Sequence, residues 1–274
     1  MDQLKHPITG QAFPSPVPPG TGWPDDPARP DTPIARTPQD VIDLAASSDL
    51  AELDAAVSMC RACPRLVKWR EDVAHDKRAS FADQPYWGRP IAGWGDAQPR
   101  ILIMGLAPAA NGGNRTGRIF TGDKSGDWLF ASLHRVGLAA QETSEHAGDG
   151  QRLIGARMAA SVRCAPPDNK PTIEERDTCA PWLHREVELV ASYLRAVVCL
   201  GSYGWDSALR TFRQMGYPVP KPKPKFGHGA EVDLGSFTLI GCYHPSQHNT
   251  FTGRLTPDMI DDIFRRAQSL AGAN

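Results

Sequence analysis

The sequence has no long hydrophobic run and almost no excess charge of either sign. No apolar stretch approaches the roughly 18 residues that a membrane-spanning helix needs, and the first residues, MDQLKHPITG, lack the apolar core of a secretory signal. Its 30 Lys and Arg against 31 Asp and Glu give a formal net charge of -1, which excludes a strongly basic tail but not local basic patches. We therefore expect a cytoplasmic protein without membrane contact, and the lack of an apolar stripe predicts a monomer.

Internal repeats and a phosphate-binding loop are also missing. No segment matches G-x-x-x-x-G-K-[ST], so nothing predicts a nucleoside-triphosphate site of that type. Residues 1–38, in contrast, hold ten of the 25 prolines. Because proline fixes φ and removes a backbone donor, these residues predict a Pro-rich, extended N-terminal arm. The rest of the chain, residues 39–274, is predicted to form a single domain.

From residue 100 onward, apolar runs typical of buried strands alternate with helical patterns. The predicted strands are 100–107, 158–164, 196–201 and 237–244, and the predicted helices are 126–137, 173–193, 203–216 and one beginning at Thr256-Pro257. An earlier helical pattern over residues 39–61 is interrupted near Ser47–Ser48. Strands separated by helices imply right-handed crossovers. The fold class is therefore α/β, with three α/β/α layers and a central four-stranded parallel sheet.

Three segments leave the carboxyl ends of predicted strands, where such sheets bind ligands: 107–123, 164–171 and 244–255. The first belongs to GLAPAANGGNRTGRIFTGD (105–123), whose glycines allow tight turns and close approach to a ligand. Arg115 and Arg118 add positive charge, and Phe120 offers a flat apolar face. A plain surface loop is the alternative.

A polar loop, HPSQHNTFTGRLT (244–256), directly follows the last predicted strand. His244 at a strand end could donate a hydrogen bond to a developing anion or act as an acid or base. The residues after it suit contacts to phosphate groups: Ser246, Gln247, Asn249 and Thr250. A structural histidine is the alternative, and the neighbouring Gly-rich loop favours the functional interpretation.

The six cysteines divide into two kinds. Cys199 and Cys242 lie in apolar strand patterns and are interpreted as small buried hydrophobic residues. The other four form a C-x-x-C pair and a later, wider pair: Cys60, Cys63, Cys164 and Cys179. Four thiolates from two parts of the chain could bind zinc or an iron–sulfur cluster, and their spacing does not choose between these. Unrelated buried thiols are the third possibility.

Four motifs together make the sequence recognisable: GLAPA (105–109), NRTGRIFTGD (114–123), VRCAPPDNKPT (162–172) and HPSQHNTFTGRLT (244–256). With these motifs in this order, the chain resembles the type-5 uracil-DNA glycosylases, the iron–sulfur branch of the uracil-DNA glycosylase superfamily. The resemblance implies removal of uracil, and of other deaminated bases such as hypoxanthine or xanthine, from single- or double-stranded DNA. It also implies a hydrolase of N-glycosidic bonds in base excision repair, associated with the nucleoid.

The same resemblance assigns the site residues. A structural [4Fe–4S] cluster, with zinc as the less favoured alternative, would be held by Cys60, Cys63, Cys164 and Cys179. The base pocket would include Ala107, Phe120 and Asn169, with Phe120 stacked on the base that is flipped out of the helix. Ala107 replaces the polar residue that positions water in most other branches. Asn114 is the preferred replacement and Asp123 the alternative.

His244 would stabilise the anion of the departing base, and the loop after it would wedge the duplex through residues such as Gln247 and Phe251. Phosphate contacts are expected from Arg115, Arg254 and the lysines at 221, 223 and 225, besides the polar loop residues. Two rival classes are a non-catalytic nucleic-acid-binding domain with a structural metal and a hydrolase of free nucleosides. The first would not need Phe120 and His244 at strand ends, and the second would not need a wedge.

Overall fold

The apolar runs predicted as strands pair in one mixed sheet of six strands, in the order β3-β5-β4-β6-β8-β7. The computed structural model describes residues 3–272. The strands are β3 (Trp94–Gly95), β4 (Ile101–Gly105), β5 (Ala156–Ala160), β6 (Ala196–Leu200), β7 (Glu231–Asp233) and β8 (Thr238–Cys242). β5, β4, β6 and β8 run parallel, while β3 and β7 pair antiparallel at the edges. The predicted four-stranded sheet was therefore incomplete, because two- and three-residue edge strands leave no pattern in the sequence.

One predicted strand is displaced. The expected strand over 158–164 begins two residues earlier and ends at Ala160, because the strand start contains a charged residue that breaks the apolar pattern. This residue, Arg157, is only 3% exposed and pairs with Asp54 at 2.7 Å and Glu186 at 2.5 Å. These ion pairs keep the arginine buried inside the strand.

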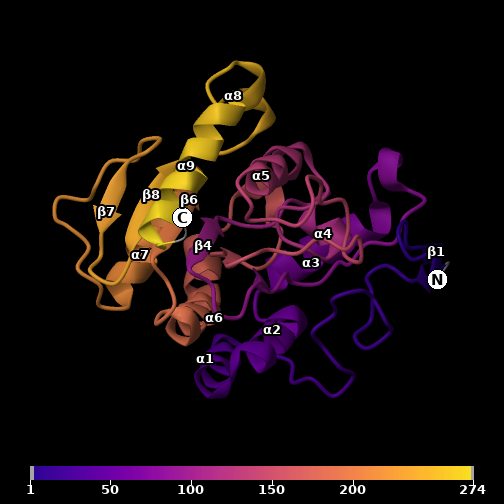
Figure 1. The fold of residues 1–274 in the computed structure, drawn as a ribbon. Helices are drawn as coiled ribbons and strands as arrows, with labels where there is room; N and C mark the ends of the chain where they lie inside the picture. Colours follow the sequence, from indigo (N-terminus) through magenta and orange to yellow (C-terminus); the bar gives the residue numbers. More distant parts are fainter. Residues whose placement is uncertain (1–2, 273–274) are drawn as a thin grey trace.

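Helices cover both faces of the sheet, which confirms the three α/β/α layers (Figure 1). Because side chains alternate along a strand, Ile101 and Ile103 pack with α5 (Lys124–Arg135) and α9 (Pro257–Leu270) on one face. Leu102 and Met104 pack with α6 (Ile173–Val190) and α7 (Gly201–Gln214) on the other. Thr172 and Thr256 cap the starts of α6 and α9, where the sequence predicts that these helices begin.

The N-terminal part adds helices outside this sandwich. The predicted break near Ser47–Ser48 separates α1 (Pro38–Ser47) from α2 (Leu50–Met59), which pack on α6. The remaining helices are α3 (Pro64–Asp76), α4 (Gly113–Thr116) and α8 (Gln247–Phe251), with 3-10 turns η1 (Ala79–Phe81) and η2 (Pro167–Asn169). Among residues 3–272, no helix is both long and apolar enough to cross a bilayer.

The proline-rich segment before α1 is irregular apart from a short antiparallel pair, β1 (Leu4–Lys5) with β2 (Ala12–Phe13). It packs against the domain, because Phe13, Val17 and Trp23 are buried in the same core as β4 and α5. These apolar side chains therefore attach the N-terminal segment to the domain, although most of its backbone forms no regular secondary structure.

Candidate active site

The carboxyl ends of the four parallel strands enclose one cavity of about 520 Å³. Its lining comes from the segments after β4, β5, β6 and β8, and includes Leu106–Ala109, Phe120, Asp123, Asp168–Lys170, Leu200–Tyr203, Tyr243, His244, Ser246, Asn249 and Arg254. The three predicted base-pocket residues, Ala107, Phe120 and Asn169, all belong to it. This is the position at which open α/β sheets bind their ligands.

Phe120, which lines this cavity, has an unusual backbone conformation. Its φ of 51° lies in the left-handed region, which is strained for a bulky residue. The ring lies so close to the end of β4 that a Cβ atom on Gly105 would stand 2.6 Å from its Cζ. Asp168 and Asn169, which also line the cavity, have positive φ as well. Strain of this kind is concentrated at functional sites.

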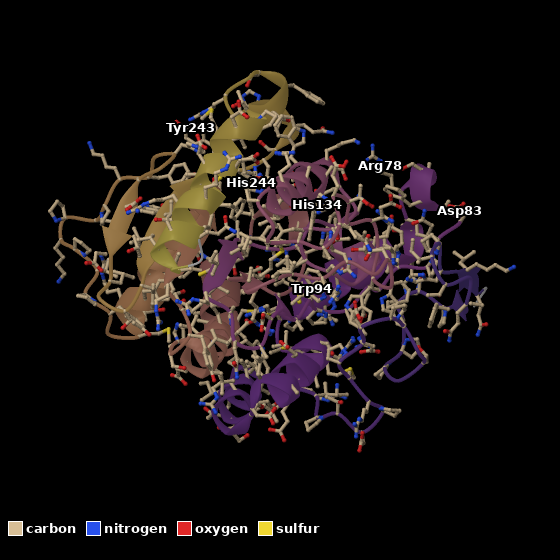
Figure 2. All side chains as sticks on the ribbon, viewed as in Figure 1. Arg78, Asp83, Trp94, His134, Tyr243 and His244 are labelled. Atoms are coloured by element: carbon tan, nitrogen blue, oxygen red, sulfur yellow. The ribbon has the colours of Figure 1, made fainter. Side chains whose placement is uncertain are left out.

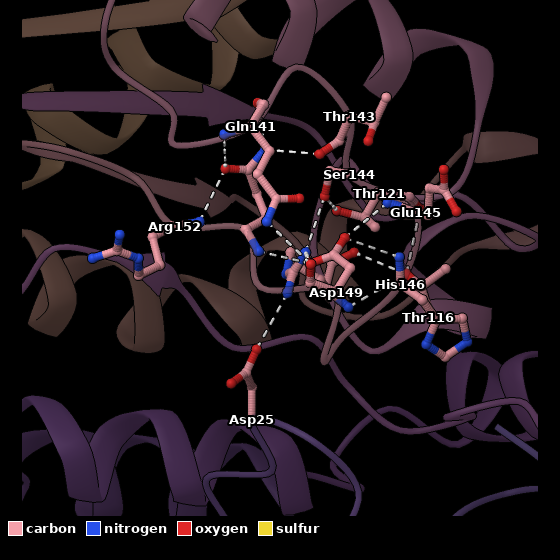
Figure 3. Close-up of polar contacts among 12 residues, drawn as sticks. Asp25, Thr116, Thr121, Gln141, Thr143, Ser144, Glu145, His146, Asp149 and Arg152 are labelled. Atoms are coloured by element: carbon pink, nitrogen blue, oxygen red, sulfur yellow. Dashed lines mark hydrogen bonds and ion pairs between the residues drawn. The ribbon is translucent and has the colours of Figure 1, made fainter. Parts of the chain in front are cut away.

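A buried polar network fixes the loop that carries Phe120 (Figure 3). Arg118, which is 2% exposed, donates hydrogen bonds to Asp149 at 2.7 Å and to Ser144 at 3.1 Å. Ser144 in turn lies 2.7 Å from the hydroxyl of Thr121, next to Phe120. The segment 141–152 therefore supports the loop that carries Phe120. Arg118, which the sequence predicted only as a source of positive charge, is a structural residue.

His244 follows the last residue of β8 by two positions and lies at the end of the sheet nearer to α8 (Figure 2). Its carbonyl accepts a hydrogen bond of 2.8 Å from the Asn249 amide, and its Cβ packs against Gly201, whose φ of 76° suits glycine. Within the described chain the imidazole has no hydrogen-bond partner. Burial lowers the pKa of His244, which the Asp123 charge opposes only in part, so the ring is neutral at physiological pH and can donate a hydrogen bond into the cavity.

Asp123 and Asn114, the two predicted water-positioning residues, are placed differently. Asp123 caps α5 through one carboxylate oxygen, which accepts from the Gly126 amide at 2.9 Å, and its side chain lines the cavity. Asn114 is only 1% exposed, does not line the cavity, and donates to the Arg70 carbonyl at 3.1 Å. The short α4 turns its side chain toward α3, so the geometry favours Asp123.

Arg115 is likewise turned inward. Its guanidinium donates to the carbonyls of Asn111 and Gly122, each at 2.9 Å, and to Gln84 at 2.7 Å. It stacks on the Phe81 ring at 3.9 Å. With these donors engaged and the side chain buried, Arg115 braces the loop and is poorly placed to bind phosphate.

The loop after His244 contains α8. Some of its polar residues stabilise this helix, and others face the groove beside the cavity. Ser246 caps the helix and Thr250 donates to the Ser246 carbonyl at 3.2 Å. Gln247 lies in an adjoining open groove of about 1040 Å³, which shares Asp123, Asn169 and Ser246 with the cavity. Phe251 is 79% exposed at the tip of the loop. The cavity and the groove therefore adjoin each other at these shared residues.

The predicted cysteine set surrounds a separate pocket. Cys60, Cys63, Cys164 and Cys179 line it and are free thiols, whereas Cys199 and Cys242 are buried in β6 and β8, as interpreted. Arg70, 1% exposed, places Nη1 3.0 Å from Cys164 Sγ. Burial and the neighbouring thiols raise the pKa of Cys63 to about 12. Among residues 3–272, no three His, Cys, Asp or Glu side chains are grouped to hold a single metal ion.

Comparison with known proteins shows the family to which this chain belongs. The family model of the Uracil DNA glycosylase superfamily matches residues 92–268. The chain belongs to this superfamily. A type-5 uracil-DNA glycosylase of Mycobacterium bovis is 58% identical over 97% of this chain and 99% of the relative. Proteins with the same name from Thermus thermophilus and Pyrobaculum aerophilum are 47% and 41% identical, over 79% and 78% of this chain and 95% and 89% of the relatives.

The sequence interpretation missed one wall of this glycosylase-type cavity. Leu200, Gly201, Ser202 and Tyr203 line it, together with Phe226. The segment after β6 was overlooked because α7 begins at once, without a loop. The glycine directly after the apolar strand, in the sequence LGSYG, could have indicated that this segment lines the cavity.

Proposed function

We propose that this protein is a uracil-DNA glycosylase of base excision repair. It flips uracil, or another deaminated base such as hypoxanthine or xanthine, out of DNA and hydrolyses its N-glycosidic bond, leaving an abasic site. The observation that carries this proposal is the presence of Phe120 and His244 on one cavity at the carboxyl end of the sheet. The relatives' shared name and their near-complete coverage support it.

The base enters the cavity and stacks on Phe120. As the N-glycosidic bond breaks, negative charge develops on the base and positive charge on the sugar. His244, neutral because burial lowers its pKa, donates a hydrogen bond to a carbonyl oxygen of the base. Donors placed at a developing anion commonly contribute ~3–4 kcal/mol to transition-state stabilisation.

Asp123 positions the attacking water. One carboxylate oxygen is engaged at the start of α5, which leaves the second to accept a hydrogen bond from water. A negative carboxylate in this cavity also favours the positive charge that develops on the sugar. Asn169 shares the wall and helps confine the base.

DNA lies along the groove that adjoins the cavity. Ser246, Gln247 and Asn249 contact the backbone beside the flipped nucleotide, and Thr250 shapes the helix that carries them. Phe251, at the exposed tip of α8, enters the gap that the flipped base leaves. Arg254 binds phosphate, since it forms no ion pair with a carboxylate within residues 3–272.

The four cysteines hold a structural [4Fe–4S] cluster, which joins the N-terminal helices to the segment after β5. Two observations support the fit: the thiols line one pocket, and a buried arginine contacts one sulfur. Four thiolates make such a cluster anionic, and a guanidinium at Cys164 suits that charge.

A labelled duplex with one uracil opposite guanine tests the activity. Hot alkali after incubation cuts abasic sites, and strand scission measures excision. We expect scission by wild type, a loss of about 10²- to 10³-fold in His244→Ala, and no loss in the surface control His134→Ala, whose residue lies on α5 outside the cavity. DNA binding without scission by cluster-containing protein would instead indicate a non-catalytic binding domain.

A further inference from the structure

The cavity is lined by more aromatic side chains than a single flipped base could stack on. Besides Phe120, it is lined by Tyr203, Phe226 and Tyr243. Its volume of about 520 Å³ falls in the range, roughly 300–1,000 Å³, that holds a drug-sized ligand. A single pyrimidine ring fills only part of such a space.

Tyr203 is the most informative of these side chains. It is 70% exposed although it lines the cavity, and only Phe251 is more exposed among the large hydrophobic side chains of residues 3–272. It stands on the first turn of α7, whose Trp205 and Leu209 are buried against the sheet. A large ring held out by a rigid helix at the mouth of a cavity is suited to stack on a ligand.

The neighbouring aromatic residues are fixed in place. The Phe226 and Tyr243 rings lie 6.0 Å apart at 55°. Phe226 packs so closely on β8 that a Cβ on Gly241 would lie 3.3 Å from its ring. The Arg254 guanidinium lies over the Tyr243 ring at 4.7 Å. This contact orders the arginine side chain and leaves its charge free to bind an anion.

Flat apolar rings and unpaired cations occur together on this wall. Lys170 and Arg254 line the cavity with Tyr203, and neither forms an ion pair within the part of the chain that the structure describes. A nucleotide offers both matching features, a base with two π faces and a phosphate. A paired base stays inside the helical stack and cannot reach a ring on the wall of this cavity, so the occupant must be unpaired.

We infer that Tyr203 and Arg254 form a subsite for a second, unpaired nucleotide of the same strand, next to the flipped one. Its base stacks on Tyr203 and its phosphate lies against Arg254. This inference rests on the proposed function. It implies that single-stranded uracil DNA, or a duplex opened at the adjacent pair, is the better substrate.

The test pairs a substitution in the protein with a deletion in the substrate. Single-stranded oligonucleotides carry one uracil, and the base on its 5′ or 3′ side is replaced by an abasic tetrahydrofuran. Wild type is expected to lose roughly tenfold in kcat/KM when the base on one side is removed. Tyr203→Ala is expected to start about tenfold lower and to show no further loss with that substrate.

Two control variants sharpen the comparison. Tyr203→Phe keeps the ring and should behave as wild type. Tyr193→Ala removes a tyrosine that is 38% exposed and lies outside the cavity, and it should also leave kcat/KM unchanged.

Wild-type activity in Tyr203→Ala would overturn the subsite, and so would equal losses on all substrates, since those indicate a structural effect. If wild type releases no uracil, the proposed function fails separately. The subsite is then tested by fluorescence anisotropy with the same oligonucleotides carrying 2′-fluorodeoxyuridine. Binding by wild type that weakens on removal of one neighbouring base, and no such dependence in Tyr203→Ala, would support it.

Discussion

The close approach of Gly105 to the Phe120 ring gives a quantitative prediction. In Gly105→Ala the new Cβ would stand 2.6 Å from Phe120 Cζ and 2.9 Å from Cε1. Carbon atoms prefer about 3.5–4.0 Å, so the ring must move by about 1 Å. It cannot retreat with its backbone, because the Phe120 carbonyl lies against Gly126, where a Cβ would be only 2.2 Å away. The ring must therefore turn out of its present position, in which we propose that it stacks on the base.

We expect Gly105→Ala to lower kcat/KM for uracil release by about 10²-fold, the cost of a misplacement of about 1 Å. Overpacking should lower the free energy of unfolding by only about 1–3 kcal/mol, so the protein stays folded in the assay. Urea unfolding measures the second quantity, and strand scission under single-turnover conditions measures the first.

A double-mutant cycle shows whether the effect passes through Phe120. Phe120→Ala removes the stacking ring and leaves room for the new methyl group. In that background Gly105→Ala should cost no further activity. An equal loss in both backgrounds, or full activity of folded Gly105→Ala, would show that the added methyl group does not act through Phe120.

Four further predictions concern stability, pH, salt and the cluster. Arg118→Ala leaves the largely buried Asp149 carboxylate without its ion-pair partner and should cost about 3 kcal/mol in urea unfolding; an unchanged midpoint would contradict the network's role. Because burial lowers the pKa of His244, neutral His244 should persist below pH 6.5 (about its usual pKa), so kcat/KM should decline only at lower pH; a decline centred above about 6.5 would contradict this. Arg254→Ala should reduce the slope of log Kd against log salt by about 1, whereas an unchanged slope would remove it from the phosphate contacts. Cys164→Ser should lose iron, labile sulfide and thermal stability together, and full iron content by chemical assay would exclude Cys164 as a ligand.

The parallel sheet and its helices could be predicted because local signals and burial agree. Apolar runs at 100–107 and 196–201 form strands, and Thr172 and Thr256 cap helices where the sequence places them. β3 and β7 could not be predicted, because two or three residues carry no periodic pattern and pair only when a neighbouring strand offers hydrogen bonds.

The direction of a loop side chain is harder to predict than its presence. Asn114 and Arg115 stand in a recognisable motif, yet α4 turns both into the protein, while Asp123 from the same motif reaches the cavity. These directions depend on the backbone path of a glycine-rich loop. Tyr203 reaches the site from a helix that the sequence presented as structural.

Identifying the products checks whether uracil is released hydrolytically at the Phe120–His244 cavity. Purified protein is incubated with a uracil-containing oligonucleotide, and mass spectrometry is applied to both the small molecules and the remaining strand. We expect free uracil and an equal amount of unbroken strand with an abasic site, both greatly reduced in His244→Ala. Free deoxyuridine, a cut strand without base loss, or an unchanged oligonucleotide would contradict it.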